Sequence, residues 1–171
     1  MVKIATGKGF ELELPETYSV LKGEAEKEIT EVLADKPKAS KLWKIMQEDP
    51  EVNANWDLSN YIAVSKLHFN DHGDIHMKIV AANALKMLGL LTENKIPGDL
   101  VKEKAGDIDD DFLIVLAAAL LHDIGNQVHR DDHNLHGVYL AIPLLNRLLP
   151  KIYQEPEVLY EIRGHILHCI Y

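Results

Sequence analysis

An uninterrupted apolar run from Phe112 to Leu121 ends directly at a histidine and an aspartate, His122 and Asp123. Ten apolar residues in a row are typical of a buried helix. Burial of an imidazole and a carboxylate at its end costs free energy unless a partner compensates for it. A carboxylate near a helix C-terminus is also unfavourably placed in the helix dipole unless a cation lies nearby. A divalent metal ion would meet both requirements, so the pair predicts a metal site.

A third candidate ligand is His76, and none of the nine histidines lies in the first 67 residues. In a helix predicted over 75–91, His76 falls on the apolar stripe, away from Lys78. One interpretation is a core histidine that bonds to a carbonyl. The other is a ligand that joins His122 and Asp123, and this set of nitrogen and oxygen donors suits Mn, Fe, Co, Ni or Zn.

Composition excludes several classes of protein. The 171 residues, 47% hydrophobic and 26% charged, are typical of one soluble globular domain. A net charge of −9 argues against binding to a nucleic-acid backbone, although a bound metal would still admit a small phosphorylated substrate. The single cysteine, Cys169, excludes an intrachain disulfide. The longest apolar run is too short to span a bilayer and the N-terminus lacks a signal-peptide pattern, so we expect a cytoplasmic protein without membrane contact.

Hydrophobic periodicity predicts an all-α fold with a short N-terminal extended arm. The arm is the alternating stretch Phe10–Leu14. Helices are expected over about 16–34, 40–48, 57–68, 75–91, 109–123, 132–149 and 157–171. We expect Asp109, Asp110 and Asp111 to supply the N-cap and the first-turn acids of the apolar helix. Residues 92–106 should form a solvated loop, and Pro143 should kink or break its helix.

The motif His76-x-x-x-Val80, followed by Leu120-Leu-His122-Asp123-Ile-Gly125, resembles the HD-domain superfamily of metal-dependent phosphohydrolases. The resemblance covers about residues 60–171. It implies an HD-domain helical bundle in which His76, His122 and Asp123 are the primary metal ligands. Residues 1–59 would form an N-terminal arm and accessory helices, and residues 60–171 the metal-binding helical core.

The binuclear branch of that superfamily suggests a second ion. By resemblance, His136 and His165 would bind it, with Asp123 bridging the two ions. The alternatives are a surface position for His136 and a packing role for His165. We expect His129 and His133 to be solvated in a polar loop, although His129 is also a candidate for contact with substrate. His68 and His72 are expected to have structural or supporting roles.

The mechanism that the resemblance implies is hydrolysis, in which a metal-activated water attacks phosphorus. Besides Asp123, Asp71 is a candidate catalytic acid that orients the water or protonates the leaving group. Arg130 and Arg163 are candidate phosphate clamps, because a guanidinium matches phosphate geometry. Their alternative interpretation is ordinary surface arginines.

Two departures from the family pattern matter. The family completes its site with an aspartate from a later helix, but no aspartate follows Asp132. Either the natural protein extends beyond Tyr171, which we favour because no stop signal precedes that residue, or Glu161 or water replaces the ligand. Asn126 also stands where the phosphodiesterase and oxygenase branches often carry a lysine, which disfavours cyclic-dinucleotide cleavage and di-iron oxygenation.

Four functions therefore stay open. The leading hypothesis is a phosphohydrolase that uses one or two divalent ions on a small phosphorylated substrate, with a nucleotide as the expected class. The second is a degenerate HD module that binds metal or nucleotide and acts through a partner. The third is a di-iron oxygenase on the same scaffold, and the last a purely structural bundle. The N-terminal third would serve as a lid, as scaffold or as the contact of a homodimer.

Overall fold

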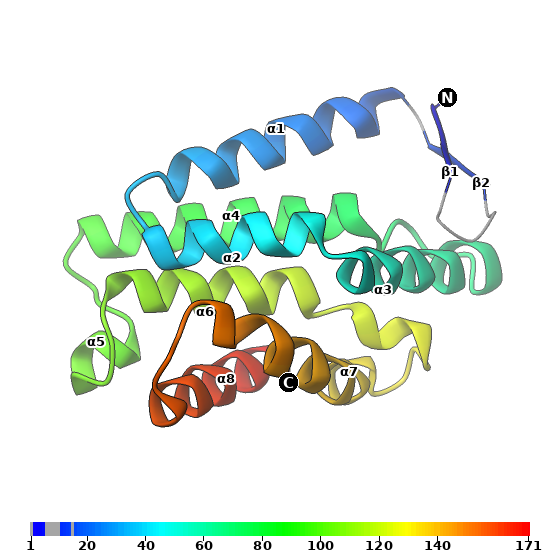
Figure 1. The fold of residues 1–171 in the computed structure, drawn as a ribbon. Helices are drawn as coiled ribbons and strands as arrows, with labels where there is room; N and C mark the ends of the chain where they lie inside the picture. The colour runs from blue at the N-terminus through cyan, green and yellow to red at the C-terminus, as the bar shows by residue number, and fades with distance from the viewer. Residues whose placement is uncertain (1, 6–10, 15) are drawn as a thin grey trace.

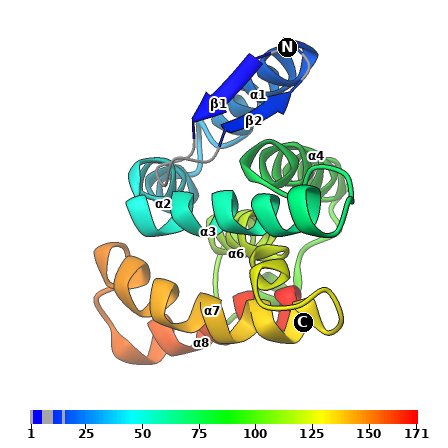
Figure 2. The same cartoon turned by 90° about the vertical axis from the view of Figure 1, so that its right-hand side faces the viewer.

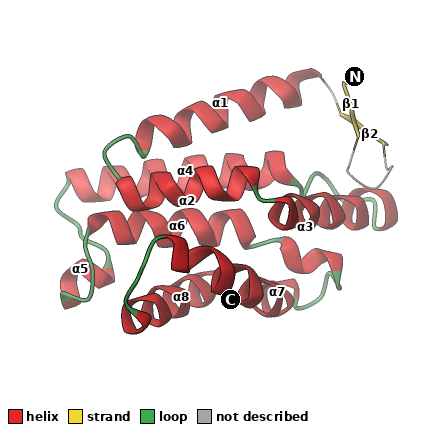
Figure 3. Ribbon diagram, in the orientation of Figure 1, coloured by secondary structure: helices red, strands yellow, loops and turns green. Residues whose placement is uncertain are grey.

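The computed structural model describes residues 2–5, 11–14 and 16–171, and nearly all of its elements are helices (Figures 1 and 3). They are the strands β1 (Val2–Ala5) and β2 (Glu11–Leu14), the helices α1 (Glu16–Val32), α2 (Pro37–Glu48), α3 (Pro50–Asn60), α4 (Asp74–Glu93), α5 (Asp99–Glu103), α6 (Ile108–Leu121), α7 (His133–Leu148) and α8 (Pro156–Ile170), the π-helical segment η1 (Tyr61–Lys66), and the 3-10 turns η2 (Ile124–Gln127) and η3 (Leu149–Lys151). The all-α class is confirmed.

The extended arm predicted at the N-terminus is one strand of a hairpin. β1 and β2 pair antiparallel, with Val2 opposite Leu14. Phe10, with which the prediction began the arm, lies outside the described residues.

Helix α6 is the centre of the molecule. It packs against α2 and α4 on one side and against α8 on the other, while α1 covers α4 and α7 packs on α8. Figure 2 shows α6 between the layer of α2, α3 and α4 and the layer of α7 and α8. Twelve of its fourteen residues are buried, as its apolar run predicts.

The N-cap of α6 differs from the prediction, whereas the three predicted aspartates do lie in its first turn. Asp107, not one of the three following aspartates, occupies the N-cap and forms a capping box with Asp110. Asp109 instead accepts hydrogen bonds from the backbone N–H groups of Lys38 and Ala39 at the start of α2. The acidic cluster therefore ties α2 to α6, a tertiary role that local sequence does not reveal.

Three other features of the helices also differ from the prediction. Helix α3 begins at Pro50, seven residues before the predicted start, because Asp49 accepts hydrogen bonds from the Glu51 and Val52 amides and caps it. The expected loop over 92–106 contains the short helix α5. Helix α7 continues across Pro143, so that proline does not break it.

The N-terminal helices share the hydrophobic core of the rest of the chain. Ala25 and Ile29 of α1, and Leu33 directly after it, belong to the same buried cluster as the α6 and α8 side chains. The buried ammonium of Lys78 on α4 lies 2.7 Å from Glu26 of α1. The boundary between residues 59 and 60 stays a prediction.

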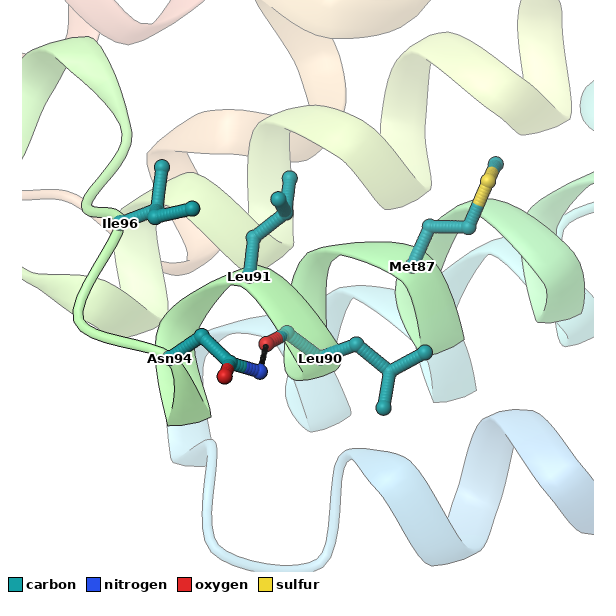
Figure 4. A pocket seen from close by; sticks show the side chains of 5 residues that line it. All are labelled: Met87, Leu90, Leu91, Asn94 and Ile96. Atoms are coloured by element: carbon teal, nitrogen blue, oxygen red, sulfur yellow. Dashed lines mark hydrogen bonds between the residues drawn. The ribbon is translucent and has the colours of Figure 1, made fainter.

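Among the described helices, α4 has the length and apolar composition of a membrane-spanning helix. In the structure it packs against α1 and α6. Near its C-terminus the exposed side chains of Met87, Leu90, Leu91 and Ile96 line a surface pocket (Figure 4). Met87 is about 16 Å along α4 from His76 at 1.5 Å per residue, so this pocket is distinct from the histidine cluster described next.

Candidate metal centre

The site forms where α6 ends and α4 begins. Asp123 follows α6, and its side chain is buried with 4% of the residue exposed. The Nε2 atoms of His122 and His76 lie 3.2 and 3.3 Å from Asp123 Oδ2. The candidate ligand atoms of these three residues all lie within 4.8 Å of one another. The structure thus brings together the three residues that the sequence motif singles out.

Two further histidines reach the same carboxylate. His133 Nε2 lies 3.3 Å from Asp123 Oδ1, and His72 Nε2 lies 4.0 Å from Oδ2. The expectation that His133 is solvated in a loop is therefore wrong. His133 is the first residue of α7 and half-buried, and His76 likewise lies in the first turn of α4. The helix predicted over 132–149 already places His133 in its first turn, where a side chain has a defined direction. The sequence therefore carried a signal for this residue.

The close packing of η2 on α7 places His133. A Cβ atom on Gly125 of η2 would lie 1.8 Å from the His133 carbonyl oxygen, so only glycine allows this approach. Gly125 therefore has a packing role at this contact. It lets the start of α7 lie directly against the turn that carries Asp123.

Hydrogen bonds orient three of the histidine rings. The Nδ1 atoms of His122, His133 and His72 lie 2.8, 3.0 and 2.7 Å from the carbonyl oxygens of Ala119, Arg130 and Asn70. A carbonyl oxygen only accepts, so each Nδ1 carries a hydrogen and donates. Each Nε2 then faces Asp123, and this arrangement is typical of metal-binding histidines.

A cation is required between these groups. An unprotonated Nε2 directs its lone pair at the carboxylate, which is repulsive unless a proton or a metal ion intervenes. Burial lowers the pKa of His122, but the hydrogen bond and charge of Asp123 outweigh burial and raise it. Burial likewise raises the pKa of Asp123, but His122 and His76 hold it well below its usual range. The side chains therefore fit a divalent ion in both donor type and charge.

Asp71 lies beside the site and supports helix α4. It is buried, its Oδ2 accepts the backbone N–H of His76 at 3.0 Å, and its Oδ1 accepts that of Gly73 at 3.3 Å. Burial raises the pKa of its carboxyl. Asp71 therefore fixes the backbone of a candidate ligand, and its catalytic role stays a prediction.

The remaining predicted residues lie farther from Asp123. His136 on α7 and His165 on α8 are half-buried, and among the described residues neither brings a ring nitrogen within 4.0 Å of an Asp123 oxygen. His129 is exposed in the loop before α7. Arg163 donates to Asn146, which lies about 20 Å along α7 from His133 at 1.5 Å per residue. Of the predicted clamps, only Arg130 lies near the cluster, through Asn126.

An all-α bundle that brings histidines and an aspartate together at its helix ends is the arrangement expected of a metal-binding helical protein. The HD-domain family model matches residues 73–170, which include His76, His122 and Asp123, and the chain belongs to this family. The resemblance stated from the sequence is thereby confirmed. The family belongs to the metal-dependent phosphohydrolase superfamily, and HD domains bind divalent metals.

A relative named as the uncharacterized protein MJ1020, from Methanocaldococcus jannaschii, is 45% identical over 124 residues. The match covers 72% of this chain and 48% of the relative, so the chain spans about half of that protein's length. No solved structure matches the chain.

Proposed function

We propose that this protein is a metal-dependent phosphohydrolase that cleaves a nucleotide or a related phosphoester. The observation that supports the proposal is the set of imidazole nitrogens directed at the buried carboxylate of Asp123. Such a set needs a cation, and family membership makes hydrolysis of a phosphoester the expected chemistry. The expected cytoplasmic location, the small-molecule substrate and the homodimer belong to the same proposal.

His76, His122 and Asp123 would hold the ion, and His133 and His72 would be additional donors or would support the carboxylate. A bound divalent ion would lower the pKa of a coordinated water and neutralise charge on phosphoryl oxygens. The protein's own contribution is to hold the imidazoles with Nε2 inward and to keep Asp123 ionised. Burial of Asp123 also strengthens its interaction with any cation, because the local dielectric is low.

Metal content is the first test. The protein is purified without chelator or nickel resin, and transition metals are counted per chain. We expect one or two ions in the native protein and their loss in His122→Ala and in Asp123→Asn. His168→Ala, an exposed residue of α8, is the matched control and should keep the native metal content. Full metal content in both site variants would show that the ion binds elsewhere.

The second test is hydrolysis of a panel of nucleotides and generic phosphodiesters by the manganese-loaded protein. Release of phosphate or nucleoside that disappears in Asp123→Asn supports the proposal. Binding of metal without turnover would instead favour the non-catalytic module. Asn126 supports this second candidate, because its amide already occupies one side of Asp123 Oδ1. Oxygen consumption by the iron-loaded protein would indicate the oxygenase.

A further inference from the structure

The side chain of Asn126 is completely buried beside Asp123. Its Nδ2 donates to the Asp123 backbone oxygen at 3.0 Å and to Asp123 Oδ1 at 3.1 Å. Its Oδ1 accepts a hydrogen bond from Arg130 Nη1 at 3.0 Å. The amide therefore connects the guanidinium of Arg130 to the carboxylate at the centre of the site.

Arg130 and Asp123 together fix which way this amide points, because the guanidinium requires its oxygen and the two Asp123 acceptors require its NH₂ group. The two ends of an asparagine amide have nearly the same shape, so hydrogen bonding alone selects its orientation. A guanidinium has donors and no acceptor, and it can pair only with the amide oxygen. The NH₂ group is then directed at Asp123. With the amide reversed, its oxygen would lie against the carboxylate and its NH₂ against the guanidinium, and both contacts would be repulsive.

Arg130 is itself held from two sides. Its guanidinium carbon lies 5.4 Å from the ring centroid of Phe69, within the range of a cation–π interaction. Its carbonyl oxygen accepts the Nδ1 hydrogen of His133 at 3.0 Å. Phe69 lies in the loop before α4, and its ring is 6.4 Å from that of His72. Arg130 thus joins the loop before α4 to the loop before α7.

We propose that Arg130 is a positioning residue, which acts through Asn126 to orient the Asp123 carboxylate toward the imidazoles. The hydrogen bond from Asn126 holds Oδ1, so that Oδ2 faces His76 and His122. Phe69 holds the guanidinium in place. The expected effect on metal affinity rests on the proposed metal centre. The orientation and hydrogen bonding of the Asn126 amide can be observed in the metal-free protein.

The test compares Arg130→Met, which replaces the apolar stem of the side chain and removes its donors, with Arg130→Lys, which restores a donor. Manganese affinity is measured by titration calorimetry on the substrate-free full chain. Arg130→Met should bind Mn²⁺ about 10–100-fold more weakly, the usual effect of removing a residue that supports a metal ligand. Arg130→Lys should recover part of the loss. Lys44→Met, an exposed cation on α2, should bind Mn²⁺ like the native protein.

A direct phosphate clamp predicts a different result. Its loss would raise KM for a phosphorylated substrate and leave the Mn²⁺ affinity of the substrate-free protein unchanged. Unchanged affinity in Arg130→Met would therefore overturn the positioning role. In a double-mutant cycle, Asn126→Ala and Arg130→Met should also be non-additive, whereas additive effects would contradict a pathway through Asn126.

The metal-free protein supplies a separate readout. In the native chain the Asn126 NH₂ resonances should be shifted and slow to exchange in NMR spectra, because the group is buried and bonded to Asp123. Arg130→Met should move these resonances and speed their exchange, while the thermal unfolding midpoint reports whether the variant is folded. Native resonances in a folded Arg130→Met would refute the inference. Absence of Mn²⁺ binding by the native chain would refute the metal centre alone.

Discussion

The two oxygens of Asp123 have different surroundings. Oδ2 faces His76, His122 and, at a longer distance, His72. Oδ1 faces His133 and the amide of Asn126. A single carboxylate thus faces side chains from the ends of three helices, from the loop before α4 and from the turn η2. This difference between the two oxygens leads to a prediction about His133, which was expected from the sequence to be solvated.

His133→Ala should reduce metal affinity by about tenfold or more, because it removes an Nε2 donor or support from the Oδ1 side of the carboxylate. The measurement is metal retained per chain after dialysis against a weak chelator. His129→Ala, an exposed residue four positions before the start of α7, is the control for that loop. Native metal retention by a folded His133→Ala would exclude His133 from the site. The same assay on His136→Ala and His165→Ala tests the second ion.

A residue-scale prediction away from the site concerns Asp49. Arg147 lowers the pKa of Asp49 from 3.8 to about 2, since its guanidinium donates to both carboxylate oxygens. The folded-state pKa is lower, so the ion pair stabilises the fold above pH 4 and its contribution is lost as the pH falls toward 2. A shift of this size corresponds to about 2 kcal/mol. Partial exposure of Arg147 reduces the expected contribution to about 1 kcal/mol.

Asp49→Asn should therefore lower the free energy of unfolding by about 1 kcal/mol at pH 7, while its side-chain oxygen still caps α3. The difference from the native protein should shrink below pH 4 in urea titrations over a pH series. Glu48→Gln, an exposed neighbour, should show no such difference. A deficit that is constant from pH 7 to pH 3 would mean that lost packing, and not the ion pair, causes it.

At the scale of elements, the site depends on where helices begin and end. His76 and His133 lie in the first turns of α4 and α7, and His122 caps the C-terminus of α6. A helix terminus directs a side chain more precisely than a loop does, because the helical backbone is fixed. The close contact between η2 and the first turn of α7 requires glycine at position 125.

Gly125→Ala should destabilise the protein by about 2–4 kcal/mol and weaken metal binding, because the added Cβ would displace the first turn of α7. Gly164→Ala on α8 is the matched control, since a Cβ there meets nothing within 4 Å. It should stabilise the helix by up to about 1 kcal/mol. Chemical unfolding and metal content measure both effects. Equal stability of the two variants would show that η2 and α7 are not in close contact.

At the scale of the whole molecule, one hydrophobic core connects both parts of the chain. Trp56 of α3 donates its indole N–H to the Leu120 carbonyl of α6 at 2.7 Å. Ser59 donates to the Ile124 carbonyl at 3.0 Å. Helices of the first 59 residues therefore support the turn that carries Asp123.

We therefore expect a single cooperative unfolding transition. Fluorescence of Trp43 and Trp56 reports on the first 59 residues, whereas far-UV circular dichroism reports on helices throughout the chain. The two midpoints should coincide, as they do for one cooperative unit. Separate midpoints would show that residues 1–59 and 60–171 unfold as independent units, despite their shared core.

The amino-acid sequence by itself determined the helical class, the central helix and the trio of His76, His122 and Asp123. These follow from local properties: the ten-residue apolar run requires burial, adjacency joins the His-Asp pair, and helical periodicity directs His76 inward. Most helix boundaries were also predicted to within a few residues. The exceptions, at α3 and α5, depend on a cap at Asp49 and on a short helix without periodicity.

Only the tertiary structure decided that His133 and His72 lie close to Asp123 and that Arg130 donates a hydrogen bond to Asn126. Each of these contacts depends on how closely two segments approach, as at Gly125, where the absence of one Cβ atom sets the separation. Hydrophobic periodicity specifies which face of a helix is buried but carries no information on such distances. The full set of side chains around Asp123 therefore follows from packing between helix ends, and its three central residues, His76, His122 and Asp123, from the sequence.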